Sequence, residues 1–341
     1  MMNYPLHNGY SGGADYGSAA EVAPRRRLKW SRLASRCVWL NGDLVPEEDT
    51  TARVLNPTLH YGPGALEVIR CYLTDRGPAI FRLEAHLQRF LQAARALGAG
   101  DLRYSLLDLR RAAHVTVQVN NLSTCTLRPI LYFDVGSDPQ MEGYHPTIAV
   151  VAGEGNELDS GWPGDQGIRA IVSSFDPVHP DVEMSPGNFD GQLASAITGR
   201  SLARRAGYDE AILLDPGGYV AGCAGQSLFL VHDGTVYTPP QAGALLDVAR
   251  DTAITLLEDS GVRVVEDARL TKEHLYAADE VFLASVANEV VPVKQVDAHE
   301  LNGGQVGPVT RSVQQLYART VRGQGRRSRG WLEYVMLEPL F

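Results

Sequence analysis

Apolar residues recur with a helical period in the first half of the chain. Between residues 83 and 97 they return every three or four positions, and Gly98 follows the last of them. The members of this apolar face are Leu83, Leu87, Phe90, Leu91, Ala94 and Leu97. A second helix is predicted over 105–119, because Ser105 can cap its N-terminus. Short apolar runs between turn residues predict strands over 66–72, 79–81, 126–135 and 147–152.

The second half of the chain alternates strand patterns with helix patterns. Strands are predicted over 168–174 and 211–214, and helices over 190–205, 247–257, 272–276 and 309–320. The stretch between the halves is polar and rich in turn residues, which is typical of a domain boundary. The predicted parts are a disordered or extended tail (1–36), a small α+β domain (37–153), an interdomain loop (154–166) and a large domain (167–341).

Composition and charge narrow the possible functions. The net charge of −9 argues against nucleic-acid binding, which needs basic surface. No apolar run reaches the ~20 residues that a membrane-spanning helix needs, so no membrane partner is expected. The cysteines have no spacing typical of a metal site, and no metal is expected. Because they also show no dense disulfide pattern, a cytoplasmic location is predicted. They are Cys37, Cys71, Cys125 and Cys223.

Short motifs in a fixed order carry a resemblance from Trp39 to Val335. In the small domain they are Leu40-Asn41-Gly42, His60-Tyr61-Gly62, Leu66-Glu67-Val68-Ile69-Arg70, the segment from Phe81 to Arg89, and Leu127-Arg128-Pro129-Ile130. In the large domain they are Gly187-Asn188-Phe189, the segments from Ala206 to Ala211 and from Ala278 to Phe282, and Glu289-Val290-Val291-Pro292-Val293. In this order they resemble the branched-chain aminotransferases, class IV enzymes of pyridoxal-phosphate fold type IV. The resemblance implies a two-domain α+β fold, with a small α/β domain and a larger pseudo-barrel domain, and a homodimer.

The resemblance also implies a cofactor site, from which this chain departs. In the family a lysine holds pyridoxal phosphate as a Schiff base, and that position falls on Met184. The carboxylate opposite the pyridine nitrogen corresponds to Gly222. At the phosphate, Asp247 replaces a glycine at a helix start and Val286 replaces a threonine. Only Arg89 matches the family's phosphate site, so the protein is expected to use no cofactor.

Polar residues nevertheless remain at positions that the resemblance assigns to the pocket. The candidate catalytic residues are Tyr61, Cys223 and Asp247, and the candidate substrate-binding residues are Arg89, Arg128, Gln226 and Ser285. Asp247 could instead cap the helix that follows it, and Cys223 could be a packed thiol. An ion pair between Arg89 and Asp247 is predicted in place of the phosphate. Glu67 and Arg70 are interpreted as a structural ion pair.

Two classes of function follow from these residues. The first is a cofactor-independent enzyme that uses the pocket for acid/base or acyl chemistry, such as cyclisation, condensation or hydrolysis, in natural-product biosynthesis. Its substrate would be an anionic small molecule bound by Arg128. Aminotransferase activity is not expected. The second is a non-catalytic relative that binds a ligand or a partner subunit. Convergent polar groups in a desolvated pocket favour the first.

Overall fold

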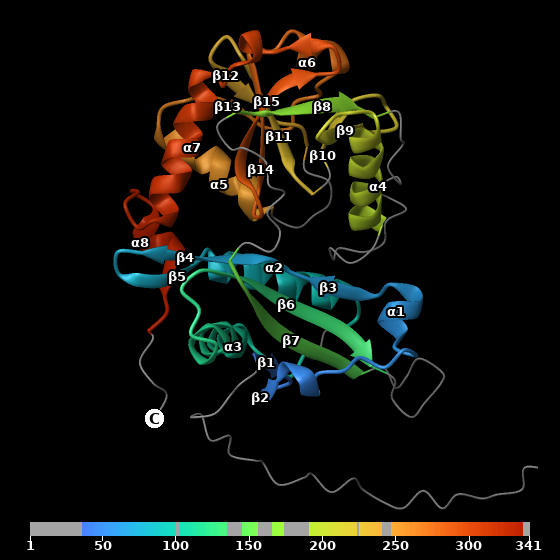
Figure 1. The fold of residues 1–341 in the computed structure, drawn as a ribbon, viewed down its shortest axis with the longest axis vertical. Helices are drawn as coiled ribbons and strands as arrows, with labels where there is room; N and C mark the ends of the chain where they lie inside the picture. The colour runs from blue at the N-terminus through green and yellow to red at the C-terminus, as the bar shows by residue number, and fades with distance from the viewer. Residues whose placement is uncertain are drawn as a thin grey trace, which may run out of the picture. The chain divides into compact units, whose positions relative to one another are not determined.

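The computed structural model describes residues 36–99, 102–134, 145–155, 166–173, 191–223, 225–240 and 247–336. The predicted tail up to residue 35, most of the predicted interdomain loop and the segment around Met184 lie outside these residues. The division into domains therefore stays a prediction. Within the described residues the strands form two sheets, each with its own helices (Figure 1).

The first sheet is antiparallel and comes mainly from the first half of the chain. Its strands follow the order β17-β5-β4-β6-β7-β1-β2, with β3 paired to β6. The bounds are β1 Cys37–Leu40, β2 Asp43–Pro46, β3 Gly64–Leu66, β4 Ile69–Thr74, β5 Gly77–Phe81, β6 Cys125–Asp134, β7 His145–Glu154 and β17 Leu332–Tyr334. Asn41 and Gly42 turn the chain between β1 and β2, and both have positive φ (47° and 99°), as Asn-Gly hairpin turns require.

Two long helices pack on this sheet and confirm the predicted helical period. They are α2 (Leu83–Ala96) and α3 (Leu106–Val119). Ser105 and Asp108 form a capping box at the start of α3, because each side chain accepts a hydrogen bond from the other residue's backbone N–H. The apolar faces of both helices join the strands in one buried cluster. Burial of each large apolar side chain stabilises the fold by about 1.5–3 kcal/mol.

The second sheet is mixed. Its strands follow the order β10-β9-β8-β15-β14-β11-β12-β13, with β16 paired to β15. The bounds are β8 Ile168–Val172, β9 Glu210–Leu214, β10 Val220–Cys223, β11 Ser227–His232, β12 Thr235–Tyr237, β13 Val264–Val265, β14 Glu280–Ser285, β15 Glu289–Val296 and β16 His299–Glu300. Every residue of β14 is buried, so this strand lies at the centre of the packed layer.

The remaining helices lie mostly in the second half of the chain. They are α1 Pro57–Tyr61, α4 Gly191–Arg205, α5 Val248–Asp259, α6 Lys272–Tyr276, α7 Pro308–Val321 and α8 Ser328–Trp331, with 3₁₀ turns at Glu47–Asp49 and Asn302–Gly304. The predicted helices over 190–205, 247–257, 272–276 and 309–320 are confirmed to within two residues. Among the helices in the described residues, none has both the length and the apolar character to span a bilayer.

A buried carboxylate fixes the start of α7. Glu280, from the central strand β14, accepts hydrogen bonds from the backbone N–H groups of Val309 (3.0 Å) and Thr310 (2.7 Å). The residue at the N-cap position is Gly307, which has no side chain to cap the helix. Glu280 therefore supplies from the sheet the cap that the helix lacks in its own sequence.

The two sheets belong to one compact unit, Ser35–Phe341. Strand β17, near the C-terminal end, pairs with β5, with Leu332 opposite Phe81. Phe81 also packs in an apolar cluster that combines strands of the first sheet with α5 and α7. Next to it, the Arg82 guanidinium forms an ion pair with Asp251 of α5 (2.5 Å) and lies over the Trp331 ring. These contacts place the start of α5 against the first sheet.

Candidate functional site at the start of helix α5

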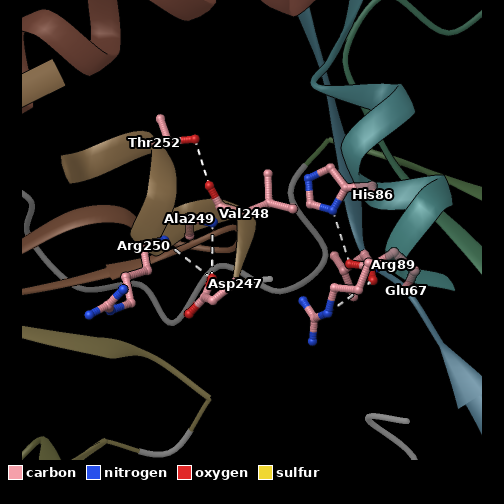
Figure 2. Close-up of polar contacts among 9 residues, drawn as sticks. Glu67, His86, Arg89, Asp247, Val248, Ala249, Arg250 and Thr252 are labelled. Atoms are coloured by element: carbon pink, nitrogen blue, oxygen red, sulfur yellow. Dashed lines mark hydrogen bonds and ion pairs between the residues drawn. The ribbon is translucent and has the colours of Figure 1, made fainter. Parts of the chain in front are cut away.

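The carboxylate of Asp247 closes the N-terminus of α5 (Figure 2). Its Oδ1 accepts hydrogen bonds from the backbone N–H groups of Ala249 (3.0 Å) and Arg250 (3.2 Å). Its Oδ2 accepts a hydrogen bond from the Ser227 hydroxyl at 2.5 Å. An α-helix leaves its first N–H groups without partners, and a ligand anion often binds there. In this chain a side chain already occupies that position, as expected if Asp247 caps its own helix.

Arg89 takes its counter-charge from Glu67 rather than from Asp247. The Arg89 Nε lies 3.6 Å from Glu67 Oε2, and His86 Nδ1 lies 3.0 Å from Glu67 Oε1 (Figure 2). Only 3% of Glu67 and 1% of His86 is exposed and Arg89 is half-buried, so the three residues form a largely buried charged cluster. The predicted Arg89–Asp247 pair is not among the ion pairs of the described residues. That prediction was wrong because each side chain finds a nearer partner, Glu67 or the amides of α5.

A narrow recess lies between this charged cluster and the start of α5. Its lining residues are Arg70, Phe81, His86, Val248, Ala249, Val286 and Tyr317. Burial raises the pKa of the Tyr317 phenol, and the Glu289 carboxylate adds to this effect, so Tyr317 is neutral at physiological pH. The recess is thus mainly apolar, with the Arg70 guanidinium and the His86 imidazole as its basic groups.

Arg70 is not paired with Glu67, contrary to the sequence-based interpretation. Its Nη1 donates a hydrogen bond to the backbone oxygen of Ala287, in the turn after β14, at 3.4 Å. Side chains an odd number of positions apart on extended backbone point to opposite faces, which explains why the predicted pair does not form. Sequence reasoning missed Arg70, His86 and Tyr317 as lining residues. The spacing of His86 three positions before Arg89 on one helix was a usable signal.

Arg128 lies on the same face of the first sheet as Arg70. Thr126 of β6 is the register partner of Arg70, and Arg128 follows it by two positions. Because alternate residues of a strand share a face, both arginines are directed to the face that meets the turn after β14. Ser285 is the last residue of β14, and its Oγ accepts a hydrogen bond from the N–H of Asn288 in this turn at 3.1 Å. In this geometry Ser285 stabilises the turn.

Cys223 and Gln226 lie in a different buried cluster, around Glu210. The Glu210 carboxylate is fully buried and accepts hydrogen bonds from Arg200 Nε (2.9 Å) and Gln226 Nε2 (2.9 Å). Burial raises the pKa of Glu210, although Arg200 opposes this. Burial also raises the pKa of the Cys223 thiol well above its ordinary value, and the neighbouring Glu210 contributes. A neutral buried thiol is a poor nucleophile, so the geometry favours a packing role for Cys223.

Tyr61 lies apart from the recess. It is the last residue of α1, and 77% of its surface is exposed. Within a single chain its phenol therefore faces solvent. Any part that Tyr61 plays in the pocket requires a second molecule that covers α1.

The comparisons with known proteins define the class to which this fold and site belong. The family model for class IV amino-transferases matches residues 64–296, and the chain belongs to this family. Within it, the chain is similar to the branched-chain-amino-acid aminotransferase of Pseudomonas aeruginosa, with 34% identity over 299 residues, 87% of this chain and 97% of that protein.

Solved structures show the same similarity. The branched-chain aminotransferase of Thermoproteus uzoniensis with norvaline superposes with a TM-score of 0.80 at 33% identity, over 89% of this chain and 100% of that one. The T.th. branched-chain amino acid aminotransferase, complexed with N-(5'-phosphopyridoxyl)-L-glutamate, gives the same values. The predicted α+β fold of fold type IV is confirmed.

These similarities correct the function expected from the sequence. A cofactor-independent enzyme of natural-product biosynthesis, carrying out cyclisation, condensation or hydrolysis, was the first expectation, and a non-catalytic relative was the alternative. Relatives that match nearly the whole chain are named aminotransferases, and one of them holds a phosphopyridoxyl ligand. Both expectations are wrong on this ground, because the comparisons point to pyridoxal-phosphate-dependent aminotransferases. The interpretation of the protein as a cofactor-free pseudoenzyme is wrong for the same reason.

The described residues do not match the cofactor pattern that the resemblance implies. The Asp247 carboxylate accepts hydrogen bonds from backbone amides at the start of α5, where the family's pattern places the phosphate. Gly222 has a φ of +130°, and a Cβ there would lie 3.3 Å from the Gln226 backbone oxygen, so an acidic side chain at this position would be strained. Lys272 is held by Asp297 at 3.1 Å, in a separate ion pair. We therefore assign no reaction step to the cofactor in this chain.

Proposed function

We propose that the protein acts on a branched-chain amino acid or the matching 2-oxo acid. In this proposal it is a divergent class IV aminotransferase with Met184 at the position of the family's Schiff-base lysine. The observation that carries the proposal is the similarity to the Pseudomonas aeruginosa enzyme, which extends over 97% of that protein. Such a similarity covers the substrate-binding elements together with the scaffold. The sequence supports the divergence, because none of its lysines lies near position 184. They are Lys29, Lys272 and Lys294.

The recess is too narrow in this structure to admit a water molecule, so a ligand can enter only where its side chains move apart. Residues in and beside it suit this substrate class. Arg70 and Arg128 lie on one face of the first sheet, where a guanidinium can hold a carboxylate through paired hydrogen bonds. Phe81, Val248 and Val286 supply apolar surface beside them, which suits an aliphatic side chain. In this arrangement Arg128 orients the acid, as the sequence predicted for an anionic ligand, and the apolar residues exclude water from the chain of the substrate.

Calorimetric titration of the full-length protein tests the proposal. The wild type is expected to bind leucine and 4-methyl-2-oxopentanoate but not 4-methylpentan-2-one, which lacks the carboxylate. Arg128→Gln should weaken binding of the oxo acid about tenfold or more, because a charge-assisted hydrogen bond contributes about 1.5–3 kcal/mol. Arg111→Gln, on the exposed side of α3, is the matched control and should leave binding unchanged. Failure of both acids to bind the wild type would refute the proposal.

We further propose that the protein is a homodimer that buries the surface around α1. Large apolar side chains are exposed there, namely Val54 (80%), Leu55 (73%), Leu59 (64%) and Tyr61 (77%). Hydrogen bonds fix the position of α1 in this surface. Asn56 caps the helix, and the Thr58 hydroxyl accepts a hydrogen bond from the N–H of Phe133. Large apolar side chains exposed together in one segment are typical of a protein interface. In a dimer Tyr61 would be available to the partner's pocket, as the resemblance implies.

Replacing Leu59 with glutamate should shift the protein toward monomer. A buried charge at an apolar contact is costly, so a rise of at least about tenfold in the dimer dissociation constant is expected. Sedimentation velocity across a concentration series measures it. Leu107→Glu, on α3, is the matched control, since Leu107 is also exposed (52%) but lies outside the patch. A wild type that sediments as a monomer at every concentration would exclude the dimer.

A further inference from the structure

We propose that Asp247 is an internal anion that competes with the phosphate group of any ligand for the start of α5. The proposal concerns the phosphate end of the site and does not depend on the carboxylate recognition proposed above. It follows from the disagreement between the family's cofactor pattern and the residues that this chain places there. Its consequence is that phosphate adds little to ligand affinity in the wild-type protein.

Two of the backbone N–H groups that would bind a phosphate are already hydrogen-bonded. Asp247 Oδ1 accepts hydrogen bonds from the N–H groups of Ala249 and Arg250, the second and third residues of the helix. The Ser227 hydroxyl donates a hydrogen bond to the other carboxylate oxygen, Oδ2. This bond links the start of α5 to the start of β11. A phosphate oxygen could reach these amides only after the carboxylate had rotated away and broken all three hydrogen bonds.

Three of the arginines around the first turn of α5 also have carboxylate partners. Arg82 pairs with Asp251. Arg89 pairs with Glu67. Arg250, in the first turn itself, turns its guanidinium away to Glu266 (2.7 Å) and to the backbone oxygen of Pro239 (3.2 Å). Each of these three guanidinium groups would have to exchange an existing partner for the phosphate. Arg70, which lines the recess beside the first turn, donates a hydrogen bond to the backbone oxygen of Ala287 instead of to a carboxylate.

The negative charge of Asp247 opposes a second anion directly. Two like charges at hydrogen-bonding separation repel each other by several kcal/mol at the effective dielectric of a protein surface. Serine at the same position would keep a neutral cap, since a hydroxyl also accepts hydrogen bonds from the first amides of a helix. The substitution Asp247→Ser therefore removes the charge while it preserves the capping function. Asp247→Asn offers a second neutral cap if the serine variant folds poorly.

Binding of pyridoxamine 5′-phosphate and of pyridoxamine to the full-length protein tests the proposal, because the two probes differ only in the phosphate. In calorimetric titration the wild type is expected to bind both with affinities within about threefold of each other. Asp247→Ser should bind pyridoxamine 5′-phosphate about tenfold more tightly than the wild type, which corresponds to ~1.4 kcal/mol. Its affinity for pyridoxamine should not change. Asp75→Ser, with the same charge change in the β4–β5 turn, should behave as the wild type.

Two results would overturn the proposal. One is a wild-type protein that prefers pyridoxamine 5′-phosphate over pyridoxamine by tenfold or more. The other is a correctly folded Asp247→Ser protein with no gain for the phosphorylated probe. If neither variant folds, the relative affinities of the wild type for the two probes still decide the proposal. Since no branched-chain acid and no turnover enter the experiment, failure of the proposed function would leave this outcome unaffected.

Discussion

Replacing Glu67 with alanine is expected to lower the free energy of unfolding by about 3–5 kcal/mol, the cost of breaking a buried ion pair. Glu67 is 3% exposed and contacts both His86 Nδ1 and Arg89 Nε. Without its carboxylate, the Arg89 guanidinium would remain partly buried and lose this counter-charge. Urea denaturation followed by circular dichroism measures the change.

Glu84 provides the control for this prediction. It lies on the exposed side of α2, where it contacts Gln88. Glu84→Ala should change the unfolding free energy by no more than about 0.5 kcal/mol. A double-mutant cycle with Arg89→Met adds a second check, because coupled partners give a double variant less unstable than the sum of the single ones. Equal effects at Glu67 and Glu84 would show that the charged cluster does not stabilise the fold.

Replacing Gly307 with alanine is expected to destabilise the protein by about 3 kcal/mol or more, from overpacking and the loss of two charge-assisted hydrogen bonds. A Cβ at this position would overlap the carboxyl group of Glu280. Glu280 would have to move, and Val309 and Thr310 would lose the hydrogen-bond acceptor at the start of α7. Thermal and urea unfolding of the purified variant provide the measurement.

The matched control is Gly330→Ala in α8, where a Cβ would meet no atom within 4 Å. This variant should stay within about 1 kcal/mol of the wild type. In addition, Glu280→Ala removes the group that the new methyl would strike. The double variant should then be no less stable than Glu280→Ala alone. An alanine at 307 that left stability unchanged would contradict the assignment of Glu280 as the cap of α7.

Local patterns in the sequence predicted the helices well. The apolar period and the Ser105 cap of α3 are properties of neighbouring residues, and the structure contains both. The N-cap role of Asp247 is local in the same sense, because the side chain binds amides two and three positions away. Such features depend on short-range geometry, which a single sequence carries in full.

The partners of the buried charges could not be predicted in the same way. Arg89 was matched with Asp247 and Glu67 with Arg70, yet Glu67 contacts His86 and Arg89. Each observed contact joins a strand segment to a helix, so it depends on how α2 packs on the first sheet. Composition gives no information on that packing angle, and the alternation of strand faces excludes the 67–70 pair only once the strand is known.

The pairing of β17 with β5 has a consequence for the protein during its synthesis. β5 leaves the ribosome long before its neighbour Leu332–Tyr334, because most of the described chain lies between the two strands. Until then one edge of β5 presents unpaired N–H and C=O groups, to which another nascent chain can add a strand. The synthesis of β17 therefore sets the time at which this edge of β5 stops being prone to aggregation. Loss of this strand through premature termination would prolong that exposure and make the truncated product a substrate for chaperones.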